Sequence, residues 1–200
     1  MEDEVIKNLL MYNSEQEWFD YKGNWFHKDE IGEYISAISN SCGLLNKDYG
    51  YIIWGISNKK EIIGTNIDFK KDIDNEPYEH YLARNLNPSI PFEFIETIIE
   101  EKRVVLLKIQ CASKIPVSYK SVRYIRIGSS KVRLDKYPDR EVALFNALQN
   151  EKKNIINTAA PDYMQNLTFE KLFMYYAKFV TLICLNSSQC VFHSVFIIFS

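Results

Sequence analysis

Two acidic side chains near the N-terminus, Glu15 and Asp20, could do chemistry together. A separation of five residues does not place both on one face of a helix or of a strand, so they converge only if the chain bends between them. Two convergent carboxylates supply the hard oxygen ligands that Mg²⁺ or Mn²⁺ prefers, and such an ion can stabilise the charge that develops during phosphodiester cleavage. Lys22 would share the strand face of Asp20, where it either meets a phosphate or pairs with Asp20. Acidic pairs at this spacing are common, so an ordinary surface pair is the alternative.

A second group of candidates is basic and lies in residues 114–140. This segment contains eight lysines and arginines but only two acidic residues. Tyr124 and Arg126 alternate along a strand pattern and share a face, which offers a ring for stacking beside a cation for a phosphate. The pattern predicts binding to a nucleic-acid backbone without sequence choice. A solvated sheet edge, where cations prevent aggregation, stays open as the alternative. The predicted nucleic-acid-binding residues are Lys22, Lys120, Arg123, Tyr124, Arg126, Lys131 and Arg133.

The stretch from Gly50 to Gly64 is the element around which these candidates must be arranged. Residues 51–56 form a continuous apolar run of strand length, which predicts a central strand covered on both faces. Gly55 inside this run indicates close approach of another part of the backbone. A turn containing Asn58 leads to a predicted short strand at 61–64, so polar groups leave the end of a buried strand, a favoured place for a site. A core hairpin without chemistry is the alternative.

The remaining periodicity predicts an α+β fold with a mixed, mostly antiparallel sheet flanked by helices. Asp20 is a poor strand residue, so either it has a specific partner or its strand is an edge strand with a solvated face. Asn40 is expected near the end of the second helix, where it could close that helix. Helices are predicted over residues 3–11, 29–45, 76–86 and 137–148, and strands over 18–22, 92–99, 103–110, 116–119, 124–127 and 131–134.

Composition sets the class of protein. With 200 residues, 46% hydrophobic and 25% charged, the chain is typical of one globular domain with an extension, and a formal net charge of −2 requires that any polyanion site be locally basic. The four cysteines are scattered, which argues against zinc and disulfides and favours a reducing, cytoplasmic location. There is no Gly-x-x-x-x-Gly-Lys-Ser/Thr loop, so no ATP site is predicted.

The C-terminal part differs in composition, and we predict one domain over residues 1–150 followed by a weakly ordered or truncated extension over 151–200. Residues 179–199 are apolar but are interrupted at 186–189. Each apolar half is about seven residues long, whereas a membrane span needs about 20, so no membrane span is expected.

Several segments, taken in order, resemble the Schlafen AlbA-type family of nucleic-acid-binding domains. Residues 15–22 are similar to its Glu-x-x-x-x-Glu-Phe-Lys motif, residues 30–40 to its helix ending in Ala-x-x-Asn, and residues 50–64 to its glycine-bounded hairpin. The other matching segments are Asn87-Pro88, Ile115-Pro116-Val117, Tyr124-Ile125-Arg126-Ile127-Gly128-Ser129 and the helix at 134–148. The resemblance covers about residues 14–150.

This resemblance implies an α/β domain that meets RNA or DNA, of a kind found in bacterial helicase-like proteins and transcriptional regulators. In animal Schlafens a related domain is a metal-dependent endoribonuclease for tRNA and rRNA with three acidic residues, which fall here on Glu15, Asp20 and Asn58. The chain departs from that set, because Asp20 replaces a glutamate and Asn58 carries no charge for a cation. The prediction is therefore nucleic-acid binding. The alternatives are an Mg²⁺- or Mn²⁺-dependent endoribonuclease and a non-catalytic module, for example a homodimer.

Overall fold

The computed structural model describes residues 2–159, with side-chain surroundings for residues 3–149, and one compact unit ends at Lys152. Within residues 2–159 no helix is both long enough and apolar enough to cross a membrane. The predicted break in the apolar stretch at 179–199 lies outside the described residues, as does most of the predicted extension.

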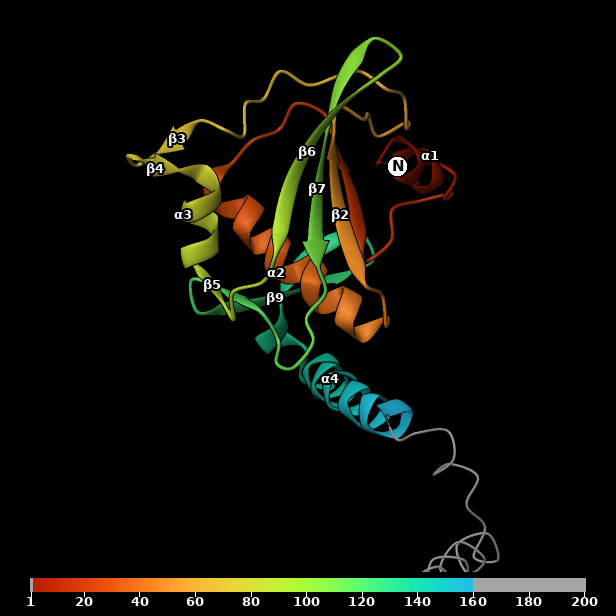
Figure 1. The fold of residues 1–200 in the computed structure, drawn as a ribbon, viewed down its shortest axis with the longest axis vertical. Coiled ribbons are helices and arrows are strands. Elements are labelled where there is room, and N and C mark those ends of the chain that lie inside the picture. Colours follow the sequence, from red (N-terminus) through yellow and green to blue (C-terminus); the bar gives the residue numbers. More distant parts are fainter. Residues whose placement is uncertain (1, 160–200) are drawn as a thin grey trace, which may run out of the picture. The chain divides into compact units, whose positions relative to one another are not determined.

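The larger sheet has the strand order β1-β2-β7-β6 (Figure 1). β2 (Tyr49–Trp54) lies between β1 (Phe19–Lys22) and β7 (Lys102–Gln110), so its predicted central position is confirmed. β1 runs parallel to β2, whereas β2, β7 and β6 (Phe92–Ile99) are antiparallel neighbours. The predicted β6–β7 hairpin is also confirmed, and its two turn residues at 100 and 101 have left-handed backbone conformations.

Both faces of this sheet are covered by helices, which is why β2 and β7 show no apolar-polar alternation. The apolar stripe of α1 (Glu2–Leu10) packs on one face, where Leu106 of β7 lies. The next residue, Leu107, points to the opposite face and packs with the apolar residues of α2 (Lys28–Leu44). Figure 1 shows α2 passing behind the sheet.

A second, antiparallel sheet has the order β10-β9-β8-β5 and packs against α2. Its strands are β5 (Leu86–Asn87), β8 (Ser118–Tyr119), β9 (Val122–Ile127) and β10 (Ser130–Arg133). The remaining elements are β3 (Asp72–Ile73), β4 (Glu76–Pro77), α3 (Tyr78–Arg84), the 3₁₀ turn Leu134–Lys136 and α4 (Pro138–Ala159). The four helices and mostly antiparallel sheets of residues 2–159 confirm the predicted α+β class.

Polar side chains of α2, rather than apolar ones alone, join this helix to the second sheet. The amide nitrogen of Asn40 donates to the carbonyl oxygens of Val117 and Tyr124, both at 2.8 Å, and its oxygen accepts from the Val117 N–H at 2.7 Å. Asn40 is fully buried inside α2. The expectation that Asn40 closes the helix was therefore wrong, because its side chain satisfies backbone groups of another sheet.

The region after β2 differs in part from the expected hairpin. Gly55 has φ +94°, and a Cβ there would lie 3.1 Å from the Arg103 carbonyl oxygen, so the predicted close backbone approach is confirmed. The predicted strand at 61–64 is reduced to a single bridge between Ile56 and Ile62. α4 begins at Pro138, near the predicted start, and continues past the predicted end at residue 148.

Candidate functional site

Glu15 and Asp20 meet because the chain turns between them. A bridge between Gln16 and Phe19 closes that turn, and the N–H of Tyr21 donates to Glu15 Oε1 at 3.0 Å. The carboxyl groups of Glu15 and Asp20 both lie next to one guanidinium group, that of Arg126. The bend that convergence requires is therefore present.

Asn58 comes to the same place from the end of β2. Glu15 and Asn58 line one open cavity of about 550 Å³, while Asp20 lies behind it with a side chain only 2% exposed. The cavity is lined by Asn13, Ser14, Glu15, Tyr21, Asn58, Lys60, Gly128 and Ser129. Only Glu15 and Asn58 of this lining were predicted from the sequence. The others were not, among them Lys60, in the turn that carries Asn58, and the Gly128-Ser129 break after a strand.

Arg126 brings a positive charge into contact with both acids of this site. Its side chain is 0% exposed, with Nη1 2.9 Å from Asp20 Oδ2 and Nη2 3.5 Å from Glu15 Oε2. Neither Nη atom has an aligned hydrogen-bond partner, nor does Asp20 Oδ2, so these contacts are ionic. A phosphate contact by Arg126, as predicted, would require the guanidinium to leave this pair. Asp20 has the specific partner that a strand aspartate needs, and the alternative of a solvated face is wrong.

Lys22 completes the charge balance around Asp20. Its Nζ lies 2.9 Å from Asp20 Oδ2 and donates to the Tyr34 hydroxyl at 3.2 Å. It also lies 5.4 Å from the centre of the Trp25 ring and 4.5 Å from that of Tyr34. Of the two outcomes expected for Lys22, the structure shows the pair with Asp20.

The four other predicted phosphate-binding cations, and their basic neighbour Arg140, also face carboxylates. The pairs are Lys120–Asp29 at 2.7 Å, Arg123–Glu141 at 3.0 Å, Arg133–Asp135 at 2.7 Å, Arg140–Glu17 at 3.4 Å and Lys131–Glu33. Four of the five acids come from outside the segment 114–135, on α2, on α4 and in the N-terminal turn. Glu33 also accepts from the Tyr124 hydroxyl at 3.0 Å. Six of the eight cations in residues 114–140 therefore have a carboxylate partner in three dimensions.

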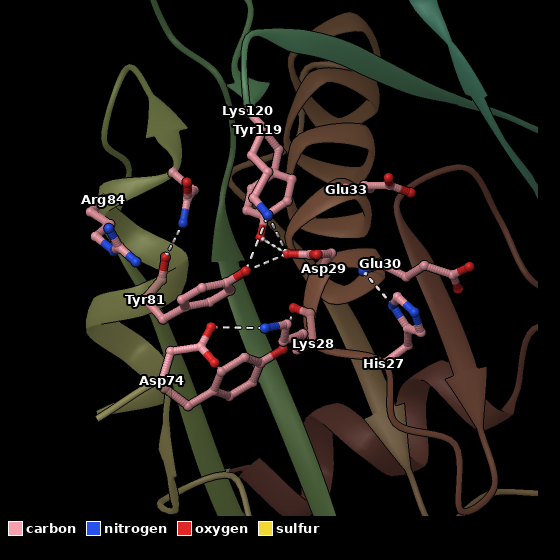
Figure 2. A network of polar contacts seen from close by, with 12 residues as sticks. His27, Lys28, Asp29, Glu30, Glu33, Asp74, Tyr81, Arg84, Tyr119 and Lys120 are labelled. Atoms are coloured by element: carbon pink, nitrogen blue, oxygen red, sulfur yellow. Dashed lines mark hydrogen bonds and ion pairs between the residues drawn. The ribbon is translucent and has the colours of Figure 1, made fainter. Parts of the chain in front are cut away.

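Lys120 belongs to a network centred on Asp29 in the first turn of α2 (Figure 2). Asp29 Oδ1 accepts from the Tyr81 hydroxyl at 2.6 Å, the Tyr119 hydroxyl at 2.8 Å and Lys120 Nζ at 2.7 Å. Partial burial works against ionisation, but these three donors outweigh it and lower the pKa of Asp29 to about 2. The network joins α2, α3 and β8, so Lys120 has a structural partner even though its side chain is partly exposed.

Arg123 and Arg133 are the two predicted cations that reach an open cavity, of about 370 Å³. Their side chains are 46% and 51% exposed. They come from the neighbouring strands β9 and β10. The cavity is lined by Asn87, Ser118, Ser121, Val122, Arg123, Arg133, Asp135 and Glu141. We refer to it as the Arg123–Arg133 cavity.

The acidic site does not fit a divalent cation. Both carboxyl groups are already engaged, Asp20 by two cations and Glu15 by a backbone N–H, and Asn58 supplies no charge. Such ions are held by free carboxylate oxygens together with waters. Among the residues that the structure describes, no three His, Cys, Asp or Glu side chains are grouped to hold a metal.

Glu15 itself has an altered titration. Burial is the largest cause, followed by the hydrogen bond and charge of Asp20, and together they raise the pKa of Glu15 to about 7. The Tyr21 N–H and the charge of Arg126 oppose this shift. The folded protein therefore holds the Glu15 proton more tightly than the unfolded chain does.

Stability is consequently expected to depend on pH through Glu15. The contribution of this group is fully present below its ordinary pKa of 4.5 and is lost as the pH rises through about 7. Glu15→Gln, which keeps an acceptor for the Tyr21 N–H, should therefore flatten the fall in unfolding free energy between pH 5 and 8 by roughly 2 kcal/mol. Urea denaturation at both pH values measures this difference. The exposed Glu93→Gln is the control, and equal slopes in wild type and Glu15→Gln would contradict the assignment.

The chain matches the family described as Schlafen, AlbA_2 over residues 15–135, more than half of its length. The chain belongs to this family. The match contains Glu15, Asp20 and β2 of this AlbA_2 domain together with Arg123 and Arg133, and it confirms the resemblance found in the sequence. No curated protein matches the chain in sequence.

Two examples illustrate the similarity of this chain to solved structures. One is the DIP2311 protein from Corynebacterium diphtheriae, with 15% identity and a TM-score of 0.44 over 64% of this chain. The match covers 25% of that protein, so the chain spans about a quarter of its length. The other is the N-terminal domain of a RecG-related protein from Nitrosomonas europaea, with 22% identity and a TM-score of 0.40 over 64% of this chain and 88% of that domain.

Proposed function

We propose that this AlbA_2 domain binds RNA or DNA through backbone phosphates, without strong sequence preference and without cleaving it. The observation that carries the proposal is the Arg123–Arg133 cavity, where two half-exposed guanidinium groups from adjacent strands face the same open space. Guanidinium groups match phosphate in a bidentate geometry. The proposal includes a regulatory role in the cytoplasm, where the buried thiols of Cys42 and Cys111 stay reduced.

The carboxylate partners of these arginines do not prevent phosphate binding. Exposed ion pairs contribute only about 0–1 kcal/mol, so a phosphate can replace Glu141 or Asp135 at small cost. Release of condensed counterions from the nucleic acid then favours binding. Lys131 and Arg126 differ, because their side chains are 14% and 0% exposed and hold parts of the fold together. The phosphate contacts are therefore assigned to Arg123 and Arg133, with Lys120 at 45% exposure as a third candidate.

Arg123→Ala/Arg133→Ala is expected to weaken binding of a single-stranded RNA about tenfold and to reduce the salt slope, by about 0.7 per phosphate contact on single strands and 0.9 on duplex DNA. Fluorescence anisotropy of labelled RNA and DNA between 50 and 200 mM salt, roughly the range over which such contacts are lost, measures both quantities. Lys70→Ala/Lys71→Ala removes two exposed cations elsewhere and is the matched control. It should leave affinity nearly unchanged.

Two results would reject the proposal. If the arginine double variant binds as wild type does, phosphates are held elsewhere. If wild type binds no nucleic acid and forms a stable dimer, the domain is the non-catalytic dimerisation module that the sequence left open.

The endoribonuclease remains the second candidate, because Glu15, Asp20 and Asn58 do converge. The engagement of both carboxyl groups by other partners weakens it. The test is to incubate tRNA and Mn²⁺ with wild type and with Glu15→Ala in parallel and to measure cleavage of the tRNA. Cleavage that the substitution abolishes would establish the nuclease, and cleavage unaffected by it would indicate a contaminant.

A further inference from the structure

Arg126 is the one lysine or arginine among the described residues that is buried. Its backbone N–H donates to the Ser41 hydroxyl of α2 at 3.0 Å, which fixes β9 against that helix. Its side chain is completely buried and reaches from β9 in the second sheet to Asp20 on β1 in the first. The guanidinium thus links two sheets and the turn that carries Glu15.

Two cations of the protein are placed against two carboxyl groups at this point. Glu15 and Asp20 together bring two carboxyl groups, and Arg126 and Lys22 bring two positive charges, which equal the charge of one divalent cation. An uncompensated buried carboxylate is strongly unfavourable, so Asp20 needs cations of some kind. A metal ion could reach Asp20 Oδ2 only by displacing Arg126, whose side chain is completely buried, whereas Lys22 contacts the same oxygen with a side chain that is 20% exposed.

We propose that Arg126, assisted by Lys22, takes the place of a divalent cation in this acidic site, so that the native domain is closed to metal and loss of the guanidinium opens a metal site. The inference is independent of the proposed phosphate binding, because Glu15, Asp20 and Arg126 do not line the Arg123–Arg133 cavity.

The test is a titration of the full chain with Mn²⁺ alone. Wild type is expected to show no saturable Mn²⁺ site by isothermal titration calorimetry or by the electron paramagnetic resonance signal of free Mn²⁺. Arg126→Ala should gain one site per chain with at least tenfold tighter binding, and its Tm should rise with Mn²⁺. Adding Glu15→Gln or Asp20→Asn to Arg126→Ala should abolish the site. Arg84→Ala, which frees Glu76 from an exposed pair at 2.6 Å, is the matched control and should gain nothing.

Three outcomes would overturn the inference. The first is a saturable Mn²⁺ site in wild type that Asp20→Asn removes. The second is a folded Arg126→Ala or Arg126→Met variant that binds Mn²⁺ no better than wild type. The third is that both variants fail to fold at every Mn²⁺ concentration, since the inference requires the ion to substitute for the guanidinium. Circular dichroism with and without Mn²⁺ separates the last two.

Discussion

Replacing Asn40 with alanine is expected to lower the free energy of unfolding by about 3 kcal/mol, because each buried polar group left without a partner costs roughly 1–3 kcal/mol. Two backbone groups lose their partner, the Val117 N–H and the Tyr124 carbonyl. The Val117 carbonyl keeps a bond from the Ser36 hydroxyl at 2.7 Å. The loss falls where α2 meets β9, the strand that carries Arg123 and Arg126.

Urea denaturation measures the Asn40→Ala effect, and Asn8→Ala on the exposed face of α1 is the control. The control should stay within about 0.5 kcal/mol of wild type, as surface substitutions do. A loss below about 1 kcal/mol in Asn40→Ala would mean that water satisfies the freed groups, because a neutral hydrogen bond by itself contributes on that order.

Gly32→Ala is expected to destabilise the domain by about 3 kcal/mol, although alanine is the better helix former. A Cβ at position 32 would lie 2.1 Å from a ring carbon of Tyr119. The ring cannot move away freely, because Tyr119 is buried and its hydroxyl donates to Asp29 at 2.8 Å. The substitution therefore separates α2 from β8 or breaks the Asp29 network (Figure 2).

A double-mutant cycle isolates this clash from helix propensity. In a Tyr119→Val background the ring is gone, so Gly32→Ala should become neutral or stabilising by up to about 1 kcal/mol. Thermal and urea denaturation of the four proteins give the coupling energy. Equal effects of Gly32→Ala in both backgrounds would show that the ring is not the obstacle.

Elements that rest on short-range patterns could be predicted. The β6–β7 hairpin, the central β2 and the long α2 follow from apolar runs and periodicity within each segment, and the structure confirms all three. The ends of helices and strands, and the weakly paired elements, could not be predicted. The expected strand at 61–64 is only a bridge, because its pairing depends on how closely the backbone at Gly55 is approached.

The electrostatics of the candidate site could not be predicted. The alternation along the strand predicts that Tyr124 and Arg126 share one face, and both do lie on β9. The alternation does not show which cation is buried. Counting charges within residues 114–140 misses Asp29 and Glu33, which α2 presents to the same surface. The role of Asn40 in joining α2 to the second sheet was missed, because its partners lie more than 70 residues away in the chain.

The sequence alone determined the family and the fold class, and it named Glu15, Asp20 and Asn58 as candidate site residues, since all of these rest on local residue order. Only the tertiary structure decided that a buried arginine contacts both carboxyl groups and that a lysine contacts Asp20 as well. Ion pairing depends on distance in space and on burial, and both are set by the packing of α2 between two sheets. The same packing leaves Arg123 and Arg133 exposed in an open cavity.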